Sequence, residues 1–220
     1  AAGHRPSPGG ADGPDGSSPL VPVLTGVAVA ILVAMAIAYT RSAGLVAGLW
    51  GASGVAVAVW LRTSRGRTSD LIFAGVMTVS ILIGEIIAGN KPPLALAFTI
   101  ANMIEIVGAV LLARRFSPTL NLSSLNGAVS FLIFAAVLAP IPAALCSVLI
   151  LSQMGQTEIV WQGFQTWWLG HTLGIAVLGS LGMSLTPAMF ARLLKPRKLL
   201  EAVILIGLVP VFYYVAFTGD

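Results

Sequence analysis

The chain has 220 residues, of which 57% are hydrophobic and only 9% are charged, and its formal net charge is +4. A soluble domain carries about 25% charged residues, so this composition excludes a water-soluble globular protein. The basic residues fall between long apolar runs, where membrane topology places them, and so they do not indicate a nucleic-acid partner. We expect an all-α, polytopic transmembrane helix bundle whose main partner is the lipid bilayer.

The first 20 residues differ in composition from the rest of the chain. They are dominated by Gly, Pro, Ala, Ser and Asp, and they lack the basic start and apolar middle of a signal peptide. Because they carry too little apolar surface to fold, residues 1–20 are predicted to form a disordered tail. Residues 21–220 are predicted to form one helical bundle.

Seven apolar segments follow the tail, and each is long enough to cross a bilayer. The fifth contains Pro140 and Pro142, which remove backbone donors and should kink the helix. It is interpreted as one bent span, because it is too short for two crossings. The segments are 21–39, 44–61, 71–89, 93–113, 127–152, 166–190 and 199–217.

The basic residues indicate an orientation. If the chain crosses the membrane seven times, ten of its twelve Lys and Arg residues lie on the side of the N-terminal tail. Cytoplasmic loops are enriched in Lys and Arg, so the N-terminus is predicted to be cytoplasmic and the C-terminus to lie on the outer side. The ten are Arg5, Arg62, Arg65, Arg67, Arg114, Arg115, Arg192, Lys195, Arg197 and Lys198; the other two are Arg41 and Lys91.

Aromatic and small residues suggest how the spans are anchored and packed. Trp167 and Trp168 lie near the predicted outer end of the sixth span, where tryptophan commonly anchors a helix at the interface. Glycines recur along the second span, and a GxxxG pair stands in the sixth; such spacing lets helix backbones approach closely. The predicted packing positions are Gly48, Gly51, Gly54, Gly170 and Gly174.

Four polar residues stand inside the apolar segments: Glu85, Asn102, Glu105 and His171. Such groups are costly in lipid and usually face the protein interior or a water-filled cavity. The predicted topology places all four in the outer half or near the midplane, which predicts an outer-facing polar pocket. Each also has a simpler interpretation. Glu85 can reach the interface, Asn102 can bond a neighbouring helix, and His171 can donate to a carbonyl.

The sequence contains no pattern that indicates catalysis. It has no Gly-rich phosphate loop and no His/Cys metal spacing, and we expect no enzyme, no metal site and no required cofactor. The lone Cys146 cannot form a disulfide within the chain. A six-coordinate haem needs two axial ligands, and the only other histidine is His4 in the tail; the alternative is that His171 serves as the single axial ligand of a haem or chlorin.

Four motifs resemble those of the MASE family of membrane-associated sensor domains, in its first class. They are GLWGASGVAVAVWLR (48–62), ILIGEIIAGN (81–90), IANMIEIVGAVLLARR (100–115) and TWWLGHTLGI (166–175). Asn102 and Glu105 match the family's NxxE, and residues 167–170 match its WWLG. The resemblance implies a non-catalytic sensory module of about eight helices in the bacterial cytoplasmic (inner) membrane, fused to or associated with a cytoplasmic histidine kinase or cyclic-di-GMP enzyme.

The chain departs from that family pattern in three places. His171 stands where the family has an acidic residue after WWLG, and the family's proline soon after the motif is missing, with Pro187 farther along. Seven spans also leave out the eighth helix and any effector. Two hypotheses follow: a sensory input domain that is a fragment of a longer receptor, or a stand-alone accessory subunit of a larger membrane complex that contacts other subunits, lipids or pigments.

Overall fold

The computed structural model describes residues 20–43, 50–64, 66–153 and 160–185, with a few residues between 189 and 208. Residues 1–19 of the predicted tail, Gly48, Pro187 and most of the predicted last span lie outside the described residues. The chain divides into two compact units, Ala1–Met183 and Ser184–Asp220. The second contributes only scattered described positions, among them an exposed pair between Lys198 and Glu201.

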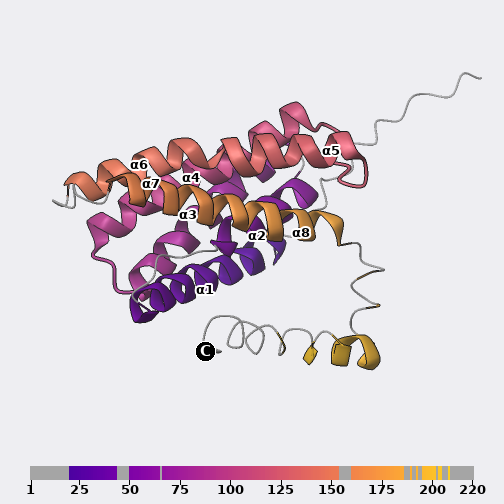
Figure 1. Ribbon diagram of the computed structural model, residues 1–220, viewed down its shortest axis with the longest axis horizontal. Coiled ribbons are helices and arrows are strands. Elements are labelled where there is room, and N and C mark those ends of the chain that lie inside the picture. The colour runs from indigo at the N-terminus through magenta and orange to yellow at the C-terminus, as the bar shows by residue number, and fades with distance from the viewer. Residues whose placement is uncertain are drawn as a thin grey trace, which may run out of the picture. The chain divides into compact units, whose positions relative to one another are not determined.

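Helices α1 (Leu20–Ala43) and α3 (Arg67–Ile87) pack along each other (Figure 1). The contact is close because glycines stand on it: a Cβ added to Gly84 would lie 2.7 Å from the carbonyl oxygen of Ala30. Val29 and Val33 are fully buried on the inner face of α1, while Leu24 and Ile31 are exposed on its other face. In a membrane protein, such an exposed apolar face contacts lipid.

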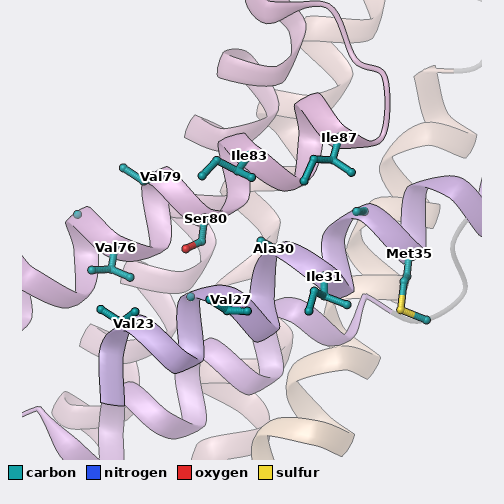
Figure 2. A pocket seen from close by; sticks show the side chains of 13 residues that line it. Val23, Val27, Ala30, Ile31, Met35, Val76, Val79, Ser80, Ile83 and Ile87 are labelled. Atoms are coloured by element: carbon teal, nitrogen blue, oxygen red, sulfur yellow. The ribbon is translucent and has the colours of Figure 1, made fainter. Parts of the chain in front are cut away.

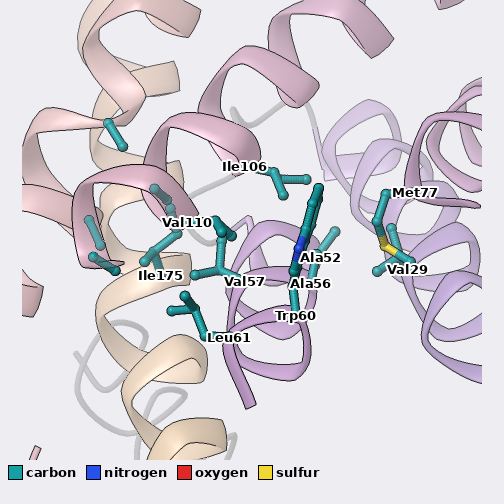
Figure 3. Close-up of a cluster of buried hydrophobic side chains, with 14 of the residues drawn as sticks. Val29, Ala52, Ala56, Val57, Trp60, Leu61, Met77, Ile106, Val110 and Ile175 are labelled. Carbon is teal, nitrogen blue, oxygen red and sulfur yellow. The ribbon is translucent and has the colours of Figure 1, made fainter. Parts of the chain in front are cut away.

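Helix α2 (Gly51–Thr63) lies inside the bundle and contacts α1, α4 and the helices that follow residue 160. Its residues are mostly small, so neighbouring helices approach it on several sides. Figure 3 shows Val57, Trp60 and Leu61 of α2 in the buried cluster, together with Ile106 and Ile175 from two other helices. The second predicted segment therefore supplies the centre of the core.

Helix α4 (Pro92–Phe116) follows a short turn after α3. Gly89 has a φ of 87° in this turn, a backbone conformation that glycine adopts without steric cost. Pro92 then opens the helix at its first position, where a missing N–H is tolerated. Glu105 is buried in the middle of α4, and Arg114 lies in its last turn.

The fifth predicted segment is one run of helix made of three parts: α5 (Leu125–Ser130), the π-helical η1 (Phe131–Leu138) and α6 (Pro140–Gln153). Pro140 and Pro142 have no N–H, so carbonyl groups in the preceding turns lose their usual partners. A π turn next to such prolines is a known way of accommodating the defect. The wider turn lies directly before the two prolines.

The sixth predicted segment begins six residues earlier than expected. It consists of α7 (Val160–Gly174), the π-helical η3 (Ile175–Gly179) and α8 (Ser180–Ser184). Helix α7 packs against α6 and α2, and η3 packs against α2. His171 lies in the last turn of α7, on the side that faces the bundle.

The described residues contain helices and no strands, as the sequence predicts. Four of these helices are long and apolar enough to cross a membrane: Leu20–Tyr39, Arg67–Ile87, Pro92–Phe116 and Leu125–Gln153. The described part of α2 has 13 residues, and the last predicted span is mostly outside the described residues. The all-α membrane fold is confirmed, while the count of seven spans stays a prediction.

Candidate functional site

The polar centre of the bundle is a pair formed by His171 of α7 and Glu105 of α4. Nδ1 of His171 contacts Oε2 of Glu105 within hydrogen-bond range, although the two residues are 66 positions apart in the sequence. Glu105 is 0% exposed and His171 is 3% exposed. A carboxylate in such surroundings requires a charged or hydrogen-bonding partner, and the imidazole ring supplies one.

The start of α2 fixes the position of α7 beside this pair. The backbone N–H of Trp50 donates to the carbonyl oxygen of Gly170 at 2.9 Å. A Cβ on Gly174 would lie 2.0 Å from the carbonyl oxygen of Trp50, and one on Gly54 would lie 2.1 Å from the carbonyl oxygen of Gly174. Three of the predicted packing positions, Gly54, Gly170 and Gly174, therefore lie where α2 and α7 approach each other closely.

Two tryptophans stack on the ring of His171. The centroids of Trp50 and His171 are 5.1 Å apart with planes inclined by 11°. Those of Trp167 and His171 are 4.6 Å apart and inclined by 14°. Phe98 of α4 lies 5.5 Å from Trp167 and extends the aromatic group. An imidazole so placed has indole rings against it and a carboxylate at its edge.

Several buried polar atoms in this group have no hydrogen-bond partner within the described structure. They include Nε1 of Trp50, Nε1 of Trp167, Oδ1 of Asn102 and Oε1 of Glu105. Buried polar atoms are nearly always satisfied by protein or by water, so this combination of free donors and acceptors is unusual.

The four predicted pocket residues take different places. Glu105 and His171 touch, and Asn102 lies one helical turn before Glu105, with its Nδ2 donating to the carbonyl oxygen of Phe98 at 2.9 Å. Glu85 is buried near the end of α3 and accepts a hydrogen bond from Asn90 in the turn that leads to α4. The described contacts thus centre the cluster on Glu105 and His171.

The predicted interfacial tryptophans are both half-buried and make contacts inside the protein. Trp167 stacks on His171, and Nε1 of Trp168 donates to the carbonyl oxygen of Val137 at 2.9 Å. A π turn would pair that carbonyl with residue 142, which is a proline without an N–H. Trp168 thereby connects α7 to the irregular helix η1.

Trp50 is not among the pocket residues that the sequence predicts. It lies 121 positions before His171, and the only signal for it was its place in the motif GLWGASG at the head of the second segment. Nothing in hydropathy distinguishes it from a lipid-facing tryptophan, because its role depends on where α7 crosses α2.

A second polar cluster, which sequence reasoning also missed, joins α2, α3 and α4. The carboxylate of Asp70 accepts from Nε1 of Trp60 at 2.7 Å, from Oγ of Ser64 at 2.7 Å and from both terminal nitrogens of Arg114 at 2.7 and 2.9 Å. Trp60 is only 3% exposed and so lies inside the protein. The cluster ties three helix ends together.

An apolar groove of about 640 Å³ runs between α1 and α3. Val27 and Ile31 of α1 and Val79 and Ile83 of α3 line this groove, and Figure 2 shows Ser80 as the polar side chain among them. Within the described part of the chain, no three His, Cys, Asp or Glu side chains gather as a metal site would require. The polar chemistry is therefore concentrated at His171 and at Asp70.

Long apolar helices around a buried polar centre define an integral membrane protein of the helical class. A family model named MASE1 matches residues 19–218, nearly the whole chain, and the protein belongs to this family of membrane-associated sensory domains. The resemblance found in the sequence motifs is thereby confirmed. No curated protein and no solved structure gave a significant match.

Proposed function

We propose that this chain is the non-catalytic input domain of a bacterial inner-membrane receptor, and that the pair of His171 and Glu105 is where the stimulus acts. The observation that carries the proposal is the burial of this pair at the meeting point of α2, α4 and α7. A stimulus that alters the pair changes how α7 is held against α4. Polar and ionisable groups inside membrane helices usually have such functional roles.

The packing around the pair supports a mechanical role for α7. The backbone contact between Trp50 and Gly170, and the close approach at Gly174, leave α7 no freedom to move away from α2 without breaking contacts. Tightly packed interfaces tend to have discrete arrangements rather than to deform continuously. Movement of α7 together with α2 relative to α4 is the output that this arrangement favours.

The proposal is tested in the receptor that carries this domain, in its native membrane. His171→Ala and Glu105→Gln should each fix the output of the cytoplasmic signalling module in one state while leaving expression unchanged. Glu201→Gln, which removes a carboxylate paired with exposed Lys198, is the matched control and should respond normally. If both site variants keep a normal response, the pair is not the sensing site. If both fail to accumulate, the pair is structural.

A second measurement distinguishes the input domain from the rival function, which is an accessory subunit of a larger membrane complex. Native mass spectrometry of the polypeptide, extracted gently from its own membrane, reveals what accompanies it. A covalently or non-covalently attached signalling module supports the input domain. Association with unrelated membrane subunits or pigments supports the accessory subunit and overturns the proposal.

A further inference from the structure

We propose that the ligand of this site is a proton, which His171 binds as an imidazolium against the indole rings of Trp50 and Trp167 and beside the carboxylate of Glu105. The inference rests on the proposed sensory function and adds the chemical identity of the stimulus. It comes from three features of the described structure: the buried pair, the indole rings stacked on the imidazole, and the free oxygen of Glu105.

The buried carboxylate of Glu105 is the reason why a proton is expected to be bound by the pair. Glu105 is 0% exposed, and its Oε2 contacts Nδ1 of His171 while its Oε1 has no partner within the described structure. An isolated negative charge is not stable in such surroundings. One proton shared by the two side chains makes the pair neutral as a whole, either as carboxylate and imidazolium or as carboxylic acid and imidazole.

The aromatic rings favour the form in which the charge is on the imidazole. The two tryptophans lie nearly parallel to His171, at centroid distances of 5.1 and 4.6 Å. The face of an indole carries partial negative charge and attracts a cation placed against it. The electron-rich indole faces and the carboxylate therefore act in the same direction, and both stabilise the imidazolium.

A proton also suits the space at the site. His171 is only 3% exposed, so a molecular ligand would have to displace packed side chains to reach the imidazole. A proton requires no such displacement. Trp167 and Phe98 are half-buried, in contrast to the fully enclosed Glu105, which places the more accessible part of the group on the side of these two rings.

Most other ionisable groups on the neighbouring helices have partners of their own. Arg62 of α2 donates to the carbonyl oxygen of Gly182, and Asp70 of α3 pairs with Arg114 of α4. Glu85 of α3 accepts from Asn90, while α6 contributes the half-buried thiol of Cys146. Arg115 lies over the ring of Phe116 near the end of α4. Helix α7 and the π-helices η1 and η3 contain no other acidic or basic side chain.

Removal of the proton would leave Glu105 negatively charged without a compensating charge. The pair would then have to admit water or separate, and either change loosens the contact between α4 and α7. Because the backbone of α2 holds α7 at Gly170 and Gly174, the loosened contact is the one that α7 makes with α4. Proton loss is thereby converted into a helix movement.

The test is a pH titration of tryptophan fluorescence on the full chain in lipid nanodiscs. An imidazolium quenches excited indole by accepting an electron, whereas neutral imidazole does so weakly. Two of the five tryptophans, Trp50 and Trp167, touch the ring. Emission should therefore rise reversibly as the imidazolium loses its proton. His171→Gln should abolish this transition, while the matched control His4→Gln, at the only other histidine, should retain it.

Glu105→Gln separates a proton site from a purely structural pair. It keeps a hydrogen-bonding side chain but removes the negative charge beside the imidazolium, so the quenching should be weaker than in the wild type at the same pH. Selective isotope labelling of the two histidines, read by NMR on the unmodified chain, gives the protonation of His171 even where a variant does not fold. A flat emission in wild type, or a transition that persists in His171→Gln, would overturn the inference, as would a His171 ring that stays in one protonation state across the titration.

The outcomes for the proton and for the sensory role are distinguishable. A flat titration together with an output that still depends on His171 would remove the proton as ligand and leave the sensory site. A titration that depends on His171, in a receptor whose output ignores both site variants, would leave a proton-binding site and remove its signalling role.

Discussion

Gly174 stands where α7 crosses the start of α2, and a side chain at this position would collide with the backbone of Trp50. A Cβ would lie 2.0 Å from the carbonyl oxygen of Trp50, which cannot move without displacing the first turn of α2. Gly75 offers a contrast within the same bundle, because a Cβ there would meet no atom within 4 Å.

Gly174→Ala is therefore expected to lower the free energy of unfolding by about 1–3 kcal/mol, the usual cost of forcing atoms into a packed contact. Gly75→Ala is the matched control, and it should be neutral or raise stability by up to about 1 kcal/mol, because alanine is the better helix former. Thermal unfolding of both variants in the same detergent compares them directly. Equal stability of the two variants would mean that α7 does not approach α2 as closely as described.

Residue-scale reasoning from the sequence singled out Glu105 and His171 but missed Trp50, and it did not give the arrangement of these side chains. The cost of polar groups in lipid identifies Glu105 and His171, and the predicted topology places them at similar depth. Whether their side chains meet depends on the rotation of α4 and α7 about their own axes. That rotation is fixed by backbone contacts such as Trp50 with Gly170, and hydropathy does not encode them.

At the scale of helices, the cluster around Asp70 holds α2, α3 and α4 together at one end. Arg114 contributes two hydrogen bonds to the Asp70 carboxylate, a fork geometry that lysine cannot reproduce. The pair is partly exposed, with side-chain exposures of 31% for Arg114 and 29% for Asp70. Solvent therefore screens the attraction, and the effect of losing it is moderate.

Arg114→Lys should accordingly lower the free energy of unfolding by about 1 kcal/mol, because one charge-assisted hydrogen bond is lost from a partly exposed site. The adjacent Arg115 is exposed and lies over the ring of Phe116, so Arg115→Lys makes the same chemical change outside the cluster. Chemical denaturation should show the first variant to be the less stable of the two. No difference between them would mean that Arg114 does not hold the three helix ends.

The helix around Pro140 shows which parts of an element a sequence predicts. Length and hydropathy predicted one span over 127–152, and the two prolines predicted a distortion within it; the structure has one run of helix over Leu125–Gln153. The position of the π turn in Phe131–Leu138 was not predictable. It depends on how nearby groups such as Trp168 satisfy the freed carbonyls, which is a property of the packed bundle.

At the scale of the whole molecule, composition was sufficient to predict a membrane protein, because a chain with 9% charged residues has no surface suited to water. The number of crossings is harder to derive. Central helices such as α2 are short and rich in small residues, so hydropathy alone does not separate a span from a buried segment. Orientation relies on the loop charges, whose effect is exerted during insertion rather than in the folded contacts.

The orientation can be measured at the two ends of α3, a helix of 21 residues that reaches about 31 Å and so crosses the hydrocarbon layer. The charge asymmetry predicts that Arg67, at its start, is cytoplasmic and that Lys91, in the turn after it, is on the outer side; both are exposed. After Cys146→Ser removes the only cysteine, Lys91→Cys should react with an impermeant maleimide in intact cells. Arg67→Cys should react only after the membrane is permeabilised. The reverse pattern would invert the topology and place the polar centre nearer the cytoplasm, whereas labelling of both from one side would mean that α3 does not cross.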